Sequence, residues 1–232
     1  MPATVDIRLA AGDRDLDVTP VRLHGAGCAL FGHPAPGAAP GFSTGPLVDH
    51  GDVVWWRLGW LGAARCPTPT GSVRIGPATR RIVGADVAEW SFAQLAAGPP
   101  ARAAEVDVLS PLYFSRSGRD HPLPDPVLVV GSLARRWNQW CPVESSLTED
   151  ELRALTSSVH LTDLDGRTRT SPVRPGQDQT GFVGRVRFAV PRAAGATTAA
   201  AFAALLRFAE IAGVGAQTGH GFGAVRVRLD PR

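Results

Sequence analysis

The sequence predicts an α+β protein built from two similar halves, and three observations support this. Apolar and polar residues alternate over several short segments, as in 4–10, where Val5, Ile7 and Leu9 alternate with charged residues. Segments with helical periodicity and recognisable capping residues lie between these strands in both halves. The chain has 232 residues, 44% of them hydrophobic, which is enough for two small cores.

In the first half, a strand over 4–10 is followed by a helix over 21–33, for which Pro20 suits the first turn. The Pro/Gly-rich stretch 34–46 is expected to be a loop. Strands over 53–61, 72–76 and 80–87 and a short helix over 91–98 complete this half. The predicted order is therefore βαβ followed by ββα.

In the second half, 98–111 indicates a linker that leads into a strand. A helix over 126–140 follows, with Asp125 as N-cap and Pro126 in its first turn. Thr148 and Glu151 form a capping box for a further helix over 148–158. The closing elements are a strand over 181–190, a long apolar helix over 197–213 and a strand over 223–229.

Each half has the length of a ferredoxin-like unit. We therefore predict two tandem ferredoxin-like (RRM-like) domains with antiparallel sheets, over residues 1–100 and 101–232. A glycine-rich loop near the carboxyl terminus precedes the last strand.

Composition limits the chemistry. All 24 cationic side chains are arginine, an abundance that matches a GC-rich genome, and arginine is a very poor proton donor at neutral pH. The three scattered cysteines and the histidine spacing predict neither disulfides nor a metal site, and no cofactor is expected.

The acidic start does not fit a signal peptide, and no stretch is expected to be long and apolar enough to span a membrane. We expect a cytoplasmic protein.

The stretch 213–227, GVGAQTGHGFGAVRV, holds five glycines between a helix and a strand. Such a loop could let backbone N–H groups approach a polyanion closely. It could equally permit a tight crossover with close packing of helix on sheet.

Several motifs of the second half resemble a known family. Ser110-Pro111 with Phe114 is followed by the turn from Pro122 to Pro126 and by Leu133 to Asn138 at the end of the helix. The glycine loop from Gly213 to Gly223 then precedes the last strand, and 23–33 and 41–48 add a weaker likeness in the first half. The chain resembles the CRISPR-associated endoribonucleases that cut precursor CRISPR RNA within its repeats, members of the RAMP superfamily. That family has two tandem ferredoxin-like folds.

The resemblance implies metal-independent cleavage by the ribose 2′-OH, which leaves a 2′,3′-cyclic phosphate and a 5′-hydroxyl. It also implies a catalytic histidine in or just after the first helix, for which His33 is the first candidate and His24 the second. With the resemblance, we favour RNA contact for the glycine loop. The RNA-binding candidates are Gly213, Gly215, Gly219, His220, Gly221, Gly223, Arg135, Arg136, Arg185, Arg187 and Arg226.

The expected partner is CRISPR repeat RNA, with other subunits of a CRISPR effector complex as a further possibility. A non-catalytic RAMP-type RNA-binding subunit is the alternative function, and it would need neither histidine. A generic RRM-like module is disfavoured because no RNP-type aromatic strand motif is found. The sequence leaves the oligomeric state open between monomer and homodimer.

Overall fold

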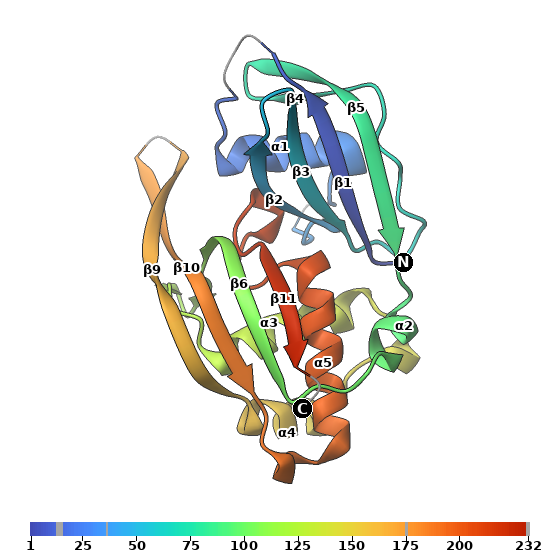
Figure 1. The fold of residues 1–232 in the computed structure, drawn as a ribbon, viewed down its shortest axis with the longest axis vertical. Helices are drawn as coiled ribbons and strands as arrows, with labels where there is room; N and C mark the ends of the chain where they lie inside the picture. The colour runs from blue at the N-terminus through green and yellow to red at the C-terminus, as the bar shows by residue number, and fades with distance from the viewer. Residues whose placement is uncertain (13–15, 36, 175, 231–232) are drawn as a thin grey trace.

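The computed structural model describes residues 1–12, 16–35, 37–174 and 176–230. Within this part of the chain, two antiparallel sheets follow one another along the long axis of the molecule (Figure 1). The first has the strand order β2-β3-β1-β5-β4, and the second has the order β11-β6-β10-β9. The predicted α+β class with tandem ferredoxin-like folds is confirmed.

The first sheet and helix α1 enclose a core of apolar side chains. Val5, Ile7 and Leu9 of β1 are fully buried, together with Trp56 and Leu58 of β3. Helix α1 lies behind this sheet in Figure 1. The elements of this half are β1 (Ala3–Ala10), α1 (Pro20–Phe31), β2 (Phe42–Asp49), β3 (Val53–Trp60), β4 (Ser72–Ile75), β5 (Ala78–Glu89) and α2 (Phe92–Ala97).

The prediction of a loop over 34–46 is wrong for residues 42–46, because strand β2 begins at Phe42. Gly45 and Pro46 suggested a loop, since both are rare inside strands. Strand β2 tolerates them because it lies at the edge of the sheet, where its register with β3 shifts between Thr44 and Leu47.

The second half follows the order βαββαβ of a ferredoxin-like unit, with a small hairpin and an additional helix inserted before the second strand. The predicted N-cap Asp125 and the capping box of Thr148 and Glu151 are both present. The elements are β6 (Ala103–Leu112), β7 (Phe114–Arg116), β8 (Arg119–His121), α3 (Pro126–Trp140), α4 (Glu149–Ser158), β9 (His160–Arg174), β10 (Gln177–Ala189), α5 (Gly195–Ala212) and β11 (Val225–Asp230).

Strand β9 has 15 residues, and most of its length shows no sequence pattern that predicts a strand. Its residues are exposed from His160 to Thr170, so neither face shows the apolar alternation that identifies a half-buried strand. Strands β9 and β10 form a long hairpin at the edge of the second sheet, and its tip points towards the first sheet (Figure 1).

Helix α5 connects the two halves. Trp137 of α3 and Phe208 of α5 pack edge to face with ring centroids 5.4 Å apart, in the core of the second half. The carboxyl end of α5 reaches the first sheet, where the Ser43 hydroxyl donates a hydrogen bond to the carbonyl of Ile211. One segment, Arg192–Ala212, does have the length and hydropathy of a membrane span, which corrects the expectation that none would. Most of its α5 side chains are buried in the protein core.

Candidate functional site

The glycine-rich loop, residues 213–224, lies between the two sheets. It begins where Gly213 ends α5 and closes where Val214 N–H donates to the carbonyl of Gly223, at 2.8 Å. Gly223 N–H in turn donates to the carbonyl of Pro111 in β6, at 3.0 Å. A short 3₁₀ turn in the loop, Thr218–His220, packs against both α1 and β2. The loop is thus wedged between elements of both halves.

Close packing explains several of the glycines. A Cβ at Gly223 would lie 1.8 Å from the carbonyl oxygen of Val214, and one at Gly215 would lie 2.3 Å from that of Tyr113. A Cβ at Gly219 would meet Pro40 at 2.7 Å, and one at Gly221 would meet Leu23 at 2.6 Å. Gly215, Gly221 and Gly223 also have positive φ values, which side chains disfavour. The packing interpretation of the loop therefore accounts for these residues.

RNA contact stays a prediction for the glycines of the loop, but three of them are buried in this conformation. Gly213, Gly219 and Gly223 are buried, so their backbones face protein rather than solvent. Gly215, Gly221 and His220 are partly exposed, and RNA contact stays a prediction for them.

His24 and His220 form a parallel stack. Their ring centroids are 4.0 Å apart and their planes differ by 1°. His24 Nδ1 lies 3.2 Å from the carbonyl oxygen of Gly219, which can only accept, so Nδ1 carries the proton and donates. Its Nε2 lies 3.5 Å from the thiol of Cys28. Both ring nitrogens of His24 are therefore occupied.

Burial, and next the neighbouring His24, lower the pKa of His220 from 6.5 to about 4. His220 is therefore neutral at physiological pH. Sequence reasoning placed these two histidines in separate roles. No local signal links them, because His24 lies 195 positions from Gly219, the neighbour of His220.

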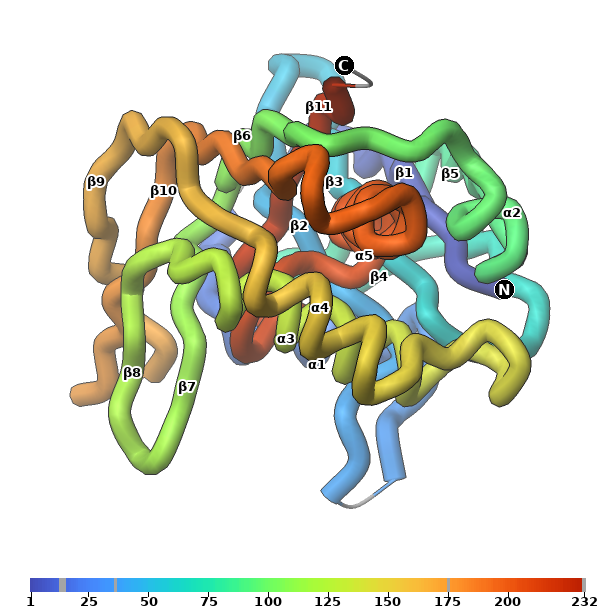
Figure 2. Tube along the Cα trace, turned by 90° about the horizontal axis from the view of Figure 1, so that it is seen from below, coloured from blue at the N-terminus to red at the C-terminus, as the bar shows by residue number. Residues whose placement is uncertain are grey.

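His33 is placed differently. It follows α1, is exposed, and makes no hydrogen bond or ring contact within the described residues. The chain that joins α1 to β2 projects from the same side of the molecule as the β7–β8 hairpin (Figure 2). The structure thus leaves the imidazole of His33 free to meet a ligand.

The arginines of β10 are paired with carboxylates. Arg185 Nε lies 3.0 Å from Asp107 and 3.3 Å from Glu105, and Arg187 lies 2.8 Å from Asp230. A hydrogen bond from Arg228 is the main cause that lowers the pKa of Glu105. RNA would have to compete with these carboxylates for Arg185 and Arg187. Arg226 of β11 is exposed and makes no ion pair within the described chain.

The two neighbouring arginines of α3 differ sharply. Arg135 is exposed and has no polar partner among the residues described. Arg136 donates to the carbonyls of Ala212 and Gly213 at the carboxyl end of α5, and burial lowers its pKa to about 10. RNA binding by Arg136 stays a prediction, and its guanidinium would have to release these carbonyls to contact a phosphate.

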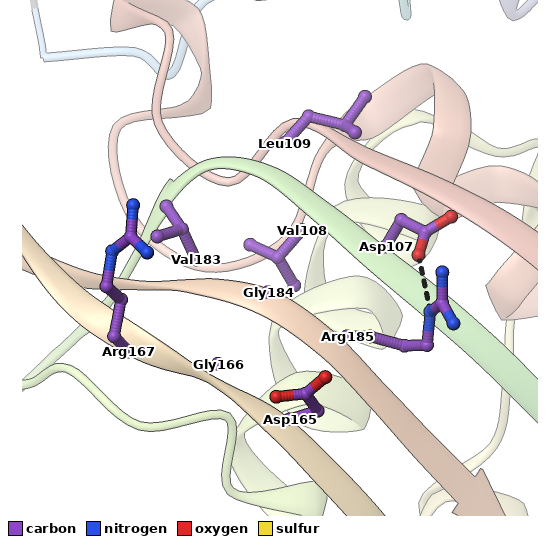
Figure 3. Close-up of a pocket in the computed structure, with 9 residues that line it drawn as sticks. All are labelled: Asp107, Val108, Leu109, Asp165, Gly166, Arg167, Val183, Gly184 and Arg185. Atoms are coloured by element: carbon purple, nitrogen blue, oxygen red, sulfur yellow. Dashed lines mark hydrogen bonds and ion pairs between the residues drawn. The ribbon is translucent and has the colours of Figure 1, made fainter.

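A groove of about 700 Å³ lies on the open face of the second sheet. Figure 3 shows Val108 and Val183 at its floor and Arg167, Arg185, Asp107 and Asp165 around it. Its charges are mixed, so it is not a continuous cationic track. No three His, Cys, Asp or Glu side chains lie close enough to hold a metal ion in the described part of the molecule.

The family model for the CRISPR-associated endoribonuclease Cas6 matches residues 106–225, which are more than half of the chain. The chain belongs to this family. The match begins in β6 and ends at the start of β11, so it includes α3 and the whole glycine-rich loop.

The Cas6 endoribonucleases of two Mycobacterium tuberculosis strains, CDC 1551 / Oshkosh and ATCC 25618 / H37Rv, are each 36% identical to the chain over 140 residues. These 140 residues are 59% of this chain, and the match spans 42% of the length of each relative.

Solved structures extend the similarity to both halves. A Cas6 product complex is 28% identical, with a TM-score of 0.79 over 98% of this chain and 100% of that one. A Cas6 substrate-mimic complex is 29% identical, with a TM-score of 0.79 over 98% of this chain and 99% of that one. A Thermus thermophilus Cas6 is 22% identical, with a TM-score of 0.75 over 98% of both chains, and shows the shared fold.

Proposed function

We propose that the chain is an endoribonuclease that cuts CRISPR repeat RNA by attack of a ribose 2′-OH, with His33 as the general base. The observation that carries the proposal is the exposed imidazole of His33 beside the first helix of a protein of the Cas6 family. Solved relatives include a substrate-mimic complex, a product complex and a mutant with one histidine replaced by alanine. These relatives support RNA processing and a role for a histidine.

The contacts of the two candidate histidines favour His33. A general base needs a ring nitrogen within hydrogen-bond reach of the proton that it removes. The nitrogens of His24 face Gly219 and Cys28, and its ring is stacked on His220. His24 would have to leave this arrangement to act as a base, whereas His33 would not.

The reaction needs no external nucleophile, since the RNA supplies its own 2′-OH. His33 would accept that proton as the oxygen attacks phosphorus. The bond to the 5′-oxygen would break as that oxygen takes up a proton from water, which leaves a 2′,3′-cyclic phosphate and a 5′-hydroxyl. Exposed arginines without intramolecular partners, Arg135 and Arg226, are the groups best placed to bind phosphates. The partly exposed backbone at Gly215 and Gly221 could add N–H donors.

The test is cleavage of labelled repeat RNA by the full chain in EDTA. His33→Ala should lower the single-turnover rate by about 10²–10⁴-fold and leave RNA affinity nearly unchanged. A 2′-deoxy substitution at the scissile ribose should abolish the cut. His160→Ala is the matched control, because His160 is also exposed but lies on β9.

Three outcomes would contradict the proposal. Cleavage by His33→Ala at the normal rate would remove His33 from the mechanism, and cutting of the deoxy substrate would exclude 2′-OH attack. Tight binding of the repeat by the unmodified chain without any cleavage would favour the alternative, a non-catalytic RNA-binding subunit.

A further inference from the structure

The outer strand of the second sheet is long and uncovered. Strand β9 is the last strand in the order β11-β6-β10-β9, and every residue from Thr162 to Thr170 is exposed. Such an edge presents a row of backbone N–H and C=O groups with no partner strand. Proteins usually protect such an edge with a covering segment, a bulge or charged side chains. Between Asp163 and Ser171, β9 pairs with β10 without a register shift.

The charges along this strand form a symmetric pattern about Gly166. Asp163 and Asp165 precede the glycine, and Arg167 and Arg169 follow it at the mirrored positions. All four side chains alternate with Leu164 and Thr168, so they share one face of the strand. None of the four makes an ion pair with any residue that the structure describes.

We propose that β9 pairs in antiparallel fashion with β9 of a second copy of this chain, about a two-fold axis at Gly166. In this register Asp163 lies opposite Arg169 of the other copy, and Asp165 lies opposite Arg167. The symmetry repeats each pair, so four ion pairs form across the new ladder. The two four-stranded sheets become one continuous sheet.

The charge pattern selects this register. A shift by two residues in one direction places Asp165 opposite Asp165, and the same shift in the other direction places Arg167 opposite Arg167. Like charges directly opposite each other destabilise a strand pair. Single-sign charge on an edge would oppose self-association in every register, whereas this pattern opposes the neighbouring registers and favours one.

Exposed apolar side chains lie on the other face of the same strand. Leu164 is 43% exposed and pairs with Val186, which is buried in the core on the helix side of the sheet. Leu161, 37% exposed, pairs with Phe188 of the same core. The partner strand would place Thr168 beside Leu164 and would cover part of this leucine.

Asp165 and Arg167 also line the groove on the open face, where they point away from the helices (Figure 3). A second copy would extend this groove across the two-fold axis. This inference concerns self-association alone and does not rest on the proposed cleavage.

The test is the mass of the RNA-free full chain in solution, measured by sedimentation over a range of concentrations and salt. The unmodified chain should show the mass of two chains, with weaker association at high salt. The double variants Asp163→Arg with Asp165→Arg and Arg167→Asp with Arg169→Asp should each be monomeric. An equimolar mixture of the two variants should restore a dimer that contains one chain of each kind.

The control is Arg65→Asp with Arg81→Asp, which makes the same charge change as Arg167→Asp with Arg169→Asp on exposed residues of the first half. It should remain dimeric. A single-chain mass for the unmodified protein at every concentration would overturn the proposal, as would dimers of either β9 variant alone. Loss of repeat-RNA binding in the β9 variants, without a dimer in their mixture, would show instead that the strand contacts RNA.

Discussion

At Gly223 the chain passes directly beneath the carbonyl of Val214 with a φ of +62°. Neither the close approach nor this φ suits a residue with a Cβ. The glycine-rich loop therefore depends on glycine for its fold, whatever its exposed positions contact.

Gly223→Ala should destabilise the protein by about 2 kcal/mol or more, because strain and overpacking act together. The free energy of unfolding in urea measures this loss. Gly25→Ala is the control: Gly25 lies in α1 with open space around its Cβ position, and alanine there should stabilise by about 0.5–1 kcal/mol. Equal stability of the two variants would contradict the packing account.

His220 makes the stability of the protein sensitive to acid. Burial and His24 lower its pKa in the folded state to about 4, whereas the unfolded value is near 6.5. Below about pH 6.5 the unfolded chain therefore binds the proton more readily than the folded one. Stability should fall as the pH is lowered from about 6.5 to about 4, by on the order of 2–3 kcal/mol.

His220→Phe tests this, because phenylalanine retains a ring to stack on His24 but does not titrate. The variant should lose most of the decrease in unfolding free energy over this pH range. His50→Phe, in an exposed position, is the matched control and should keep the decrease. An unchanged pH dependence in His220→Phe would show that other groups cause it.

At the scale of elements, α3 and α5 are joined by Arg136, which the sequence placed among the RNA-binding candidates. Arg136 hydrogen-bonds the last carbonyls of α5, which lack partners within their own helix. Arg135, one residue earlier, is exposed. Adjacent residues on one helix thus differ in what they contact.

Arg136→Met should lower the free energy of unfolding by about 2–3 kcal/mol, since it leaves charge-assisted hydrogen bonds unmade. Arg135→Met should leave stability nearly unchanged. If Arg135 binds a phosphate, its replacement should reduce the salt dependence of RNA affinity by about one ion. Unfolding curves and RNA titrations at several salt concentrations distinguish the two residues, and the reverse pattern would refute this assignment.

At the scale of the whole molecule, the two sheets are tied together by contacts from the far end of the chain. Ser43 of β2 bonds the carbonyl of Ile211, and the 3₁₀ turn of the glycine-rich loop packs on α1 and β2. A Cβ at Gly59 of β3 would lie 1.7 Å from the carbonyl oxygen of Ile211. The packing of the first half therefore depends on contacts with residues of the second half.

We expect the two halves to unfold together. Tryptophan fluorescence and far-UV circular dichroism should give coincident urea transitions, and the calorimetric and van't Hoff enthalpies should agree. Residues 1–100 expressed alone should be markedly less stable than in the full chain. Two resolved transitions would show instead that the halves fold independently.

The sequence by itself determined the local features: the strands with alternating apolar residues, the caps at Asp125 and Thr148, and the glycine that ends α5. These depend on neighbours a few residues away, and their periods and caps can be read from the chain. The tertiary structure alone decided that His24 stacks on His220, that Arg136 turns inward, and that exposed β9 is a strand. Those outcomes depend on contacts between segments far apart in sequence, which no local pattern encodes.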